Sequence, residues 1–179
     1  MIETMEKPAP TLTQLVGLPL KISRHAGNML VLHFGRIRRS TGAHGPESWG
    51  DLAIHVQCPW RMSAAGRLLF GSADRWRPAE GVEIEDWDAW WESPHPNRED
   101  KGWERLLGGT DEATRSFECL DDSILVTEVH ESGIGDLKIV FSSTVAFDIF
   151  ADGTDHEFWR LLAPADRSDH LVCPSEAEN

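Results

Sequence analysis

The chain has 179 residues, of which 30 are acidic and 17 are basic, so its formal net charge is −13. This length suits one domain, and so negative a chain disfavours nucleic acid or an anionic membrane as a partner. A basic protein partner is compatible with the charge, which also helps to keep the protein in solution.

The N-terminal residues 1–10 contain Pro8 and Pro10, and we expect this end to be loosely ordered. It lacks the charged and then apolar pattern of a signal peptide. No later segment approaches the roughly 20 apolar residues that span a bilayer. The sequence therefore predicts a cytoplasmic protein. The cysteines are odd in number and widely spaced, which indicates free thiols at Cys58, Cys119 and Cys173.

Apolar and polar residues alternate over residues 18–24, and the largely apolar residues 29–35 indicate a second strand. The Gly27-Asn28 pair between these segments is a turn signal, so the two strands are expected to form a β-hairpin. Residues 36–50 are rich in glycine and have the composition of a loop.

Residues 51–58 predict the strand around which the rest of the domain is built. One face of this strand is apolar and carries Leu52, Ile54, Val56 and Cys58. His55 and Gln57 lie on the other face, because neighbouring residues of a strand point to opposite sides. Pro59 cannot donate a ladder hydrogen bond and is expected to end the strand. Trp60 and Arg61 would then sit on a corner.

After a turn at residues 63–65 and a short strand at residues 66–71, the character of the chain changes over residues 73–109. Five of the eight tryptophans lie in this excursion. Its acids between Arg77 and Arg98, where Lys and Arg are absent, are Glu80, Glu83, Glu85, Asp86, Asp88 and Glu92. The spacing of Trp87, Trp90 and Trp91 suits one face of a helical turn. A connection this long is usually functional or mobile.

Residues 110–120 predict the main helix, with Asp111 and Glu112 in its first turn, where they suit the helix dipole. The last third of the chain alternates clearly. Four strands joined by short connectors favour an antiparallel meander at residues 123–131, 135–141, 144–150 and 157–162. A frayed tail is expected over residues 164–179. The predicted fold is a single α+β domain with its core at about residues 15–162, mostly antiparallel sheet with a C-terminal β-meander and one main helix.

The pattern His-x-x-Cys-Pro occurs at residues 55–59 and again at residues 170–174. Two histidines and two thiolates are the ligands of a tetrahedral zinc site. However, residues three apart on a strand point to opposite faces, so His55 and Cys58 share an ion only if a bulge intervenes. We therefore expect no metal and no cofactor, with Cys58 acting as a small buried apolar residue.

Two catalytic hypotheses stand beside this interpretation. Cys58 is a nucleophile only if His55 or Arg61 favours its thiolate, and none of the cysteines lies in a known protease signature. Acids and aromatic platforms are also typical of glycoside hydrolases, and the excursion supplies Glu83, Glu85, Asp86 and Asp88. Acids this dense are more often a solvated face, and tryptophans are common interface anchors. Trp60 and Trp159 are instead expected in the core.

Several segments together resemble a family of small bacterial proteins of unknown function. They are LHFG at residues 32–35, HVQCPWRM at 55–62, the GS-x-D at 71–74, FADG at 150–153 and EFWRLL at 157–162. The resemblance covers most of residues 15–162. It implies no established activity, so it brings no catalytic residues.

We expect from these patterns a non-catalytic cytoplasmic binding protein of the immunity or antitoxin kind, with a basic protein partner. The alternative is an enzyme or small-ligand binder with a site beside the corner at residues 55–61 and the excursion at residues 83–91. The candidate binding residues are His55, Arg61, Trp87, Trp90 and Trp91. Exposed strand edges also make a homodimer plausible.

Overall fold

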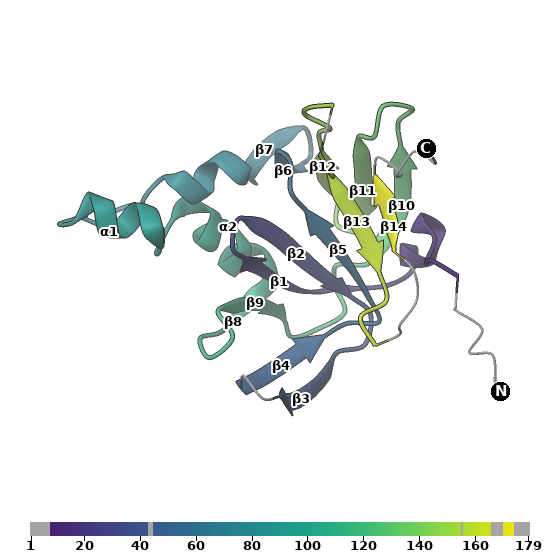
Figure 1. Cartoon of the computed structure of the whole chain (residues 1–179), viewed down its shortest axis with the longest axis horizontal. Helices are drawn as coiled ribbons and strands as arrows, with labels where there is room; N and C mark the ends of the chain where they lie inside the picture. The colour runs from purple at the N-terminus through teal and green to yellow at the C-terminus, as the bar shows by residue number, and fades with distance from the viewer. Residues whose placement is uncertain (1–7, 43–44, 155, 166–169, 174–179) are drawn as a thin grey trace.

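The computed structural model describes residues 8–42, 45–154, 156–165 and 170–173. The predicted loose end at residues 1–7, and most of the predicted tail at residues 166–169 and 174–179, lie outside these ranges. Over the described residues, a seven-stranded and a five-stranded sheet pack face to face (Figure 1). Their strand pairs are antiparallel, as the sequence predicts.

The seven-stranded sheet has the order β14-β13-β5-β2-β1-β9-β8. Its strands are β1 (Leu20–Ala26), β2 (Met29–Phe34), β5 (Leu52–Val56), β8 (Gly108–Asp111), β9 (Ser116–Cys119), β13 (Trp159–Leu162) and β14 (Leu171–Cys173). The five-stranded sheet has the order β10-β11-β12-β6-β7. Its strands are β6 (Trp60–Ala64), β7 (Arg67–Gly71), β10 (Val126–Glu131), β11 (Leu137–Phe141) and β12 (Val145–Ile149).

A separate hairpin and short helices complete the fold. The hairpin consists of β3 (Arg38–Gly42) and β4 (Gly45–Trp49). The helices are two α-helices, α1 (Trp87–Glu92) and α2 (Arg98–Leu107), and two 3₁₀ turns, η1 (Leu12–Leu15) and η2 (Ser72–Trp76), within the described residues.

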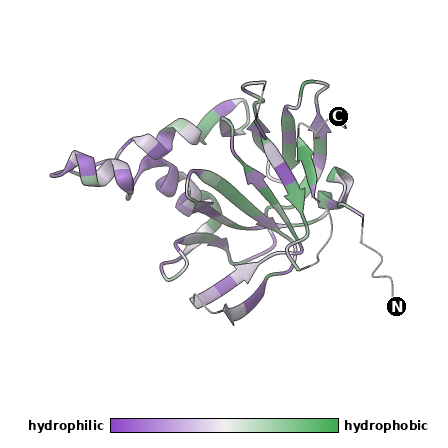
Figure 2. Cartoon of the chain, in the orientation of Figure 1, coloured by the Kyte–Doolittle hydropathy of each residue, from purple (hydrophilic) through white to green (hydrophobic). Residues whose placement is uncertain are grey.

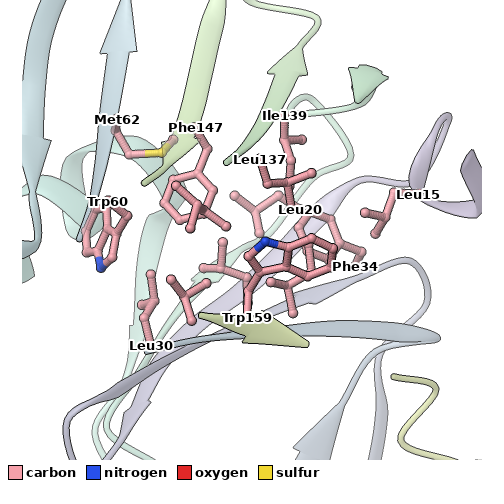
Figure 3. Close-up of a cluster of buried hydrophobic side chains, with 14 of the residues drawn as sticks. Leu15, Leu20, Leu30, Phe34, Trp60, Met62, Leu137, Ile139, Phe147 and Trp159 are labelled. Carbon is pink, nitrogen blue, oxygen red and sulfur yellow. The ribbon is translucent and has the colours of Figure 1, made fainter. Parts of the chain in front are cut away.

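The core lies between the two sheets, where apolar residues from alternate strand positions meet (Figure 3). On β5 the predicted apolar face is confirmed, because Leu52, Ile54 and Val56 are buried in this core. Trp159 from the seven-stranded sheet is fully buried across from Phe147 of the five-stranded sheet (Figure 3). The strands of both sheets are accordingly more hydrophobic than α1 (Figure 2).

The predicted corner is the place where the chain crosses from one sheet to the other. β5 ends at Val56, and Pro59 precedes β6, as the missing donor of proline predicts. Two backbone hydrogen bonds hold the crossing, from Gln57 N to Phe158 O at 2.8 Å and from Phe150 N to Pro59 O at 2.9 Å. Trp60 belongs to β6 rather than to the corner, and the predicted turn at residues 63–65 begins two residues later.

The main helix is not at residues 110–120, where the structure has the hairpin of β8 and β9. The Asp111 carboxylate closes the turn, since its Oδ1 accepts from the backbone N–H of Ala113 at 3.0 Å. Arg115 adopts a left-handed φ of 49°, which ends any helical path. Acidic residues in a first helical turn and an Asp-led turn look alike in sequence, and here the local side-chain hydrogen bond prevails.

The longest helix of the described chain is α2, which lies in the excursion, where the sequence predicts only a helical turn at Trp87, Trp90 and Trp91. Asn97 caps it, because its Oδ1 accepts from the N–H of Asp100 at 2.8 Å. The Asp100 carboxylate accepts in return from the N–H of Asn97 at 3.1 Å. This reciprocal cap three residues apart was readable as a helix start.

Three other expectations are corrected by strand pairing. Within residues 36–50, expected to be a loop, residues 38–42 and 45–49 pair as β3 and β4. The meander has three strands, because the fourth, β13, crosses to the other sheet and pairs with β5. Leu171–Cys173, expected in the frayed tail, forms the edge strand β14.

Gly102→Ala is expected to destabilise the protein, although glycine to alanine in an exposed helix usually stabilises by about 1 kcal/mol. A Cβ on Gly102 would lie 2.3 Å from Cγ of the Phe70 ring. Overpacking of this kind costs about 1–3 kcal/mol. Urea denaturation measures the change, with Gly133→Ala as the control because a Cβ there meets nothing within 4 Å. A more stable Gly102→Ala variant would contradict the tight contact between α2 and β7.

Candidate functional site

The structure turns the predicted excursion into an arm, residues 78–97, that projects from the body of the protein. The two ends of the arm are joined at its base, where Ala79 N donates to Pro96 O at 3.2 Å and Arg98 N donates to Arg77 O at 2.9 Å. Helix α1 lies on the arm and away from both sheets (Figure 1). The arm therefore presents its side chains to solvent on a tethered support.

Helix α1 begins at a sequence-encoded cap. The Asp86 carboxylate accepts a hydrogen bond from the N–H of Ala89 at 3.0 Å, which satisfies one of the free donors of the first turn. The helical turn that the sequence predicts for Trp87, Trp90 and Trp91 is confirmed.

Four indole rings form what we call the tryptophan cluster: Trp76, Trp87, Trp90 and Trp91. Ring centroids are 4.9 Å apart for Trp90 and Trp91, 5.7 Å for Trp87 and Trp90, and 6.0 Å for Trp76 and Trp91. Trp90 is only 6% exposed, whereas Trp76, Trp87 and Trp91 are 39%, 49% and 48% exposed. Adjoining aromatic rings left this open to water are typical of an interaction surface.

The same arm is strongly acidic. Its exposed carboxylates are Glu80, Glu83, Glu85, Asp86, Asp88 and Glu92. Lys and Arg are absent from residues 78–97. Trp87, Trp90 and Trp91 therefore lie in a locally negative field, whereas Trp76 lies between Arg75 and Arg77. A glycoside hydrolase needs two carboxylates that flank the scissile bond, whereas these acids are spread over an exposed arm.

His55 and Arg61 do not meet, although they lie close in sequence. His55 is on β5 in the seven-stranded sheet, opposite Arg160 of β13. Arg61 is on β6 in the five-stranded sheet, where its Nε donates to Asp148 Oδ2 at 3.2 Å and its guanidinium lies 4.8 Å from the Phe150 ring centroid. The structure therefore does not bring His55, Arg61 and residues 83–91 of the arm together in one site.

The two His-x-x-Cys stretches do come together, because β13 pairs with β5 on one side and with β14 on the other. Cys58 and Cys173 are buried in the core between the sheets. His55 and His170 lie on the outer side with Arg160, whose Nη1 is 3.3 Å from His170 Nδ1. As the alternation of strand residues predicts, the imidazoles and the thiols therefore lie on opposite sides of the sheet. Pro174, the last residue of the second motif, lies outside the described residues.

The chemistry of this region is correspondingly restricted. Among the described residues, no three His, Cys, Asp or Glu side chains are grouped so that they could hold a metal ion. Burial raises the pKa of the Cys58 thiol to about 12. Because the thiolate is the reactive form, Cys58 is not a nucleophile near neutral pH.

Sequence reasoning missed a buried polar network at the root of the arm. Glu99 of α2 is 1% exposed, and its Oε1 lies 2.7 Å from His25 Nε2. The same oxygen accepts from Trp103 Nε1 at 3.0 Å. Glu99 and Trp103 are one helical turn apart, so a correct placement of α2 would have revealed half of the network. The network ties α2, and with it the base of the arm, to β1.

A groove of about 770 Å³ lies between β7 and α2, beside the base of the arm. Leu69, Phe70 and Ala79 supply its apolar lining. Its charged lining is balanced and consists of Asp74, Glu80, Arg98, Lys101, Glu104 and Arg105. Part of that charge is already paired, since Lys101 Nζ donates to Glu104 Oε2 at 2.7 Å.

Comparison with known proteins finds no match that suggests a function. No protein-family model matches this chain, and neither the curated proteins nor the solved structures contain a match. The resemblance to a family of small bacterial proteins therefore stays a prediction. Within the described residues, α1 and α2 are both too short and too polar to cross a membrane.

Proposed function

We propose that this chain is a non-catalytic cytoplasmic binding protein that holds a basic protein partner through the tryptophan cluster. The observation that carries the proposal is the exposure of Trp87 and Trp91 on an arm without a Lys or Arg of its own, with the exposed Trp76 beside them at its base. Indole rings supply a large contact area at little entropic cost. An inhibitor of a basic protein, of the immunity or antitoxin kind, needs this combination of aromatic anchors and acids.

Electrostatics would select the partner. The carboxylates of the arm attract basic surfaces and repel acidic ones. An arginine of the partner also gains a cation–π contact when it lies over an indole face. The chain already contains such a pair, since the Arg75 guanidinium lies 5.6 Å from the Trp76 ring centroid.

The arm is held in place before any partner arrives. Its base is joined by backbone hydrogen bonds, and Asn97, the last residue of the arm, caps α2. Glu99 then anchors α2 to His25. A surface held in its binding conformation loses less entropy on association.

The double variant Trp87→Ala/Trp91→Ala is expected to lose the partner. Basic proteins are captured at low salt from the source cells on immobilised wild-type protein, and the retained protein is then purified. Titration of this purified partner measures Kd for each variant. Removal of two anchoring tryptophans raises Kd by roughly 1,000-fold, if each is a hot spot worth about 2 kcal/mol.

Leu120→Ala is the matched control, because Leu120 is 83% exposed and lies outside the arm. This variant should bind as the wild type does. Added salt should weaken the wild-type complex, because exposed charges are screened. The proposal fails if no basic protein is retained, or if the retained protein binds the double variant and the wild type equally well.

A further inference from the structure

A second set of polar residues lies on the outer face of the seven-stranded sheet, away from the arm. The pairing register sets Arg24, Val31, His55 and Arg160 opposite one another on the four neighbouring strands β1, β2, β5 and β13. Residues that pair directly point to the same face, and neighbouring strands are about 4.8 Å apart. The four side chains therefore form a row roughly 15 Å long. We call it the arginine–histidine row.

Arg24 is the unusual member of the row. It is partly buried, yet within the described chain its guanidinium makes no hydrogen bond and no ion pair. Burial lowers the pKa of Arg24. Glu47, which acts on Arg24 only at longer range, offsets part of this effect. A partly buried cation without a partner is unfavourable. This cost is removed if an anion binds.

Two acids of the neighbouring β8–β9 hairpin are already engaged. Arg39 of the β3–β4 hairpin reaches over the same face and donates to Glu118 from both terminal nitrogens, at 3.2 Å and 2.7 Å. Arg39 also lies 4.0 Å from Asp111. The β3–β4 hairpin therefore engages Glu118 through Arg39, while its own Glu47 acts on Arg24 at longer range.

His55 and His33 add further donors. His55 makes no hydrogen bond within the described residues. His33 lies in the next row of the sheet, 2% exposed, and its Nδ1 accepts from Gly50 N at 3.3 Å. The proton of the neutral ring is therefore on Nε2, which is buried without a partner. The side chains of Arg24, His55 and His33 therefore carry N–H donors that meet no acceptor among the described residues.

At the far end of the row the charge is balanced. Arg160 Nε donates to Glu157 Oε1 at 2.7 Å, and Gln57 Nε2 donates to the same oxygen at 2.9 Å. Glu157 is thereby held at Arg160 and away from Arg24. At the Arg24 end, by contrast, the positive charge is compensated only by the longer-range attraction of Glu47.

We propose that the arginine–histidine row binds one phosphate or carboxylate group of a small molecule, between Arg24 and His55. Charge-assisted hydrogen bonds from Arg24 would hold the anion, with His55 as a second donor. A small molecule fits better than a polyanion, because the row is short and the chain as a whole carries a charge of −13. The site is independent of the partner surface proposed for the arm.

Titrations with inorganic phosphate and with acetate, at constant ionic strength, test the site. The readouts are the side-chain NMR signals of His55 and a calorimetric Kd. Arg24→Gln is expected to weaken binding by roughly tenfold to a hundredfold, because it removes a hydrogen bond from a charged donor. Arg67→Gln on β7 is the control and should bind as the wild type does. Stronger binding of phosphate or of acetate identifies which group the natural ligand carries.

A second variant protects the test against misfolding. His55→Gln keeps Arg24 and should weaken binding less than Arg24→Gln does, with circular dichroism reporting that both variants are folded. Trp87→Ala/Trp91→Ala should bind phosphate normally, so that failure of one proposal is separable from failure of the other. The inference is overturned if neither anion gives a saturable response at millimolar concentrations, or if Arg24→Gln and Arg67→Gln bind equally.

Discussion

Lowering the pH from 6.5 to 5 is expected to reduce the free energy of unfolding by about 2 kcal/mol through His33 alone. Burial, together with the positive charges of Arg24 and His55, lowers the pKa of His33 to about 3. In the unfolded chain the ring takes up a proton near pH 6.5. Between these values the unfolded state binds more protons, so stability is full above pH 6.5 and is lost on acidification towards pH 3.

Urea denaturation at a series of pH values measures this slope. His33→Asn should flatten it, because the asparagine oxygen still accepts from Gly50 N but does not titrate. His130→Asn is the control, since His130 is exposed on β10. His55, whose pKa burial and Arg160 lower to about 4, adds a smaller slope of the same sign. An unchanged slope in His33→Asn would show that the pKa of His33 is the same in the folded and the unfolded protein.

The second large effect is expected at Trp159, whose replacement by alanine should cost about 3–5 kcal/mol. This side chain is 0% exposed between the two sheets, and its Nε1 donates to Gly135 O at 2.9 Å (Figure 3). The change leaves a cavity and removes the partner of a buried carbonyl oxygen. Trp159→Phe fills most of the cavity and should cost less.

Trp87→Ala provides the matched control for this chemistry, because it removes the same side chain from an exposed position on the arm. Its effect on the free energy of unfolding should be within about 0.5 kcal/mol. Urea denaturation followed by far-ultraviolet circular dichroism compares the three variants without relying on tryptophan fluorescence. Equal losses for Trp159→Ala and Trp87→Ala would contradict the division between core and arm tryptophans.

Local patterns predicted the local structure well. Period-two alternation placed the β1–β2 hairpin and the apolar face of β5. The spacing of Trp87, Trp90 and Trp91 placed α1. Strand parity at His55 and Cys58 separated the imidazole from the thiol before any fold was known. These features depend on residues only a few positions apart.

The failures have a common origin in competition between local and distant partners. Asp111 suited both a helix start and an Asx turn, and pairing of Ser116–Cys119 with β1 decided for the hairpin. β13 looks like the next strand of a meander, but burial of Trp159 and Leu161 between the sheets requires it beside β5.

The amino-acid sequence by itself determined the strand faces, the tryptophan-bearing helical turn and the acidity of the arm, because each follows from side-chain periodicity or charge. The tertiary structure alone decided that the arm projects and that Trp87 and Trp91 stay exposed on it. It also decided that Arg24, His55 and Arg160 share one row. Their juxtaposition requires four strands to pair in register, and that register is set by burial of the opposite face of the sheet.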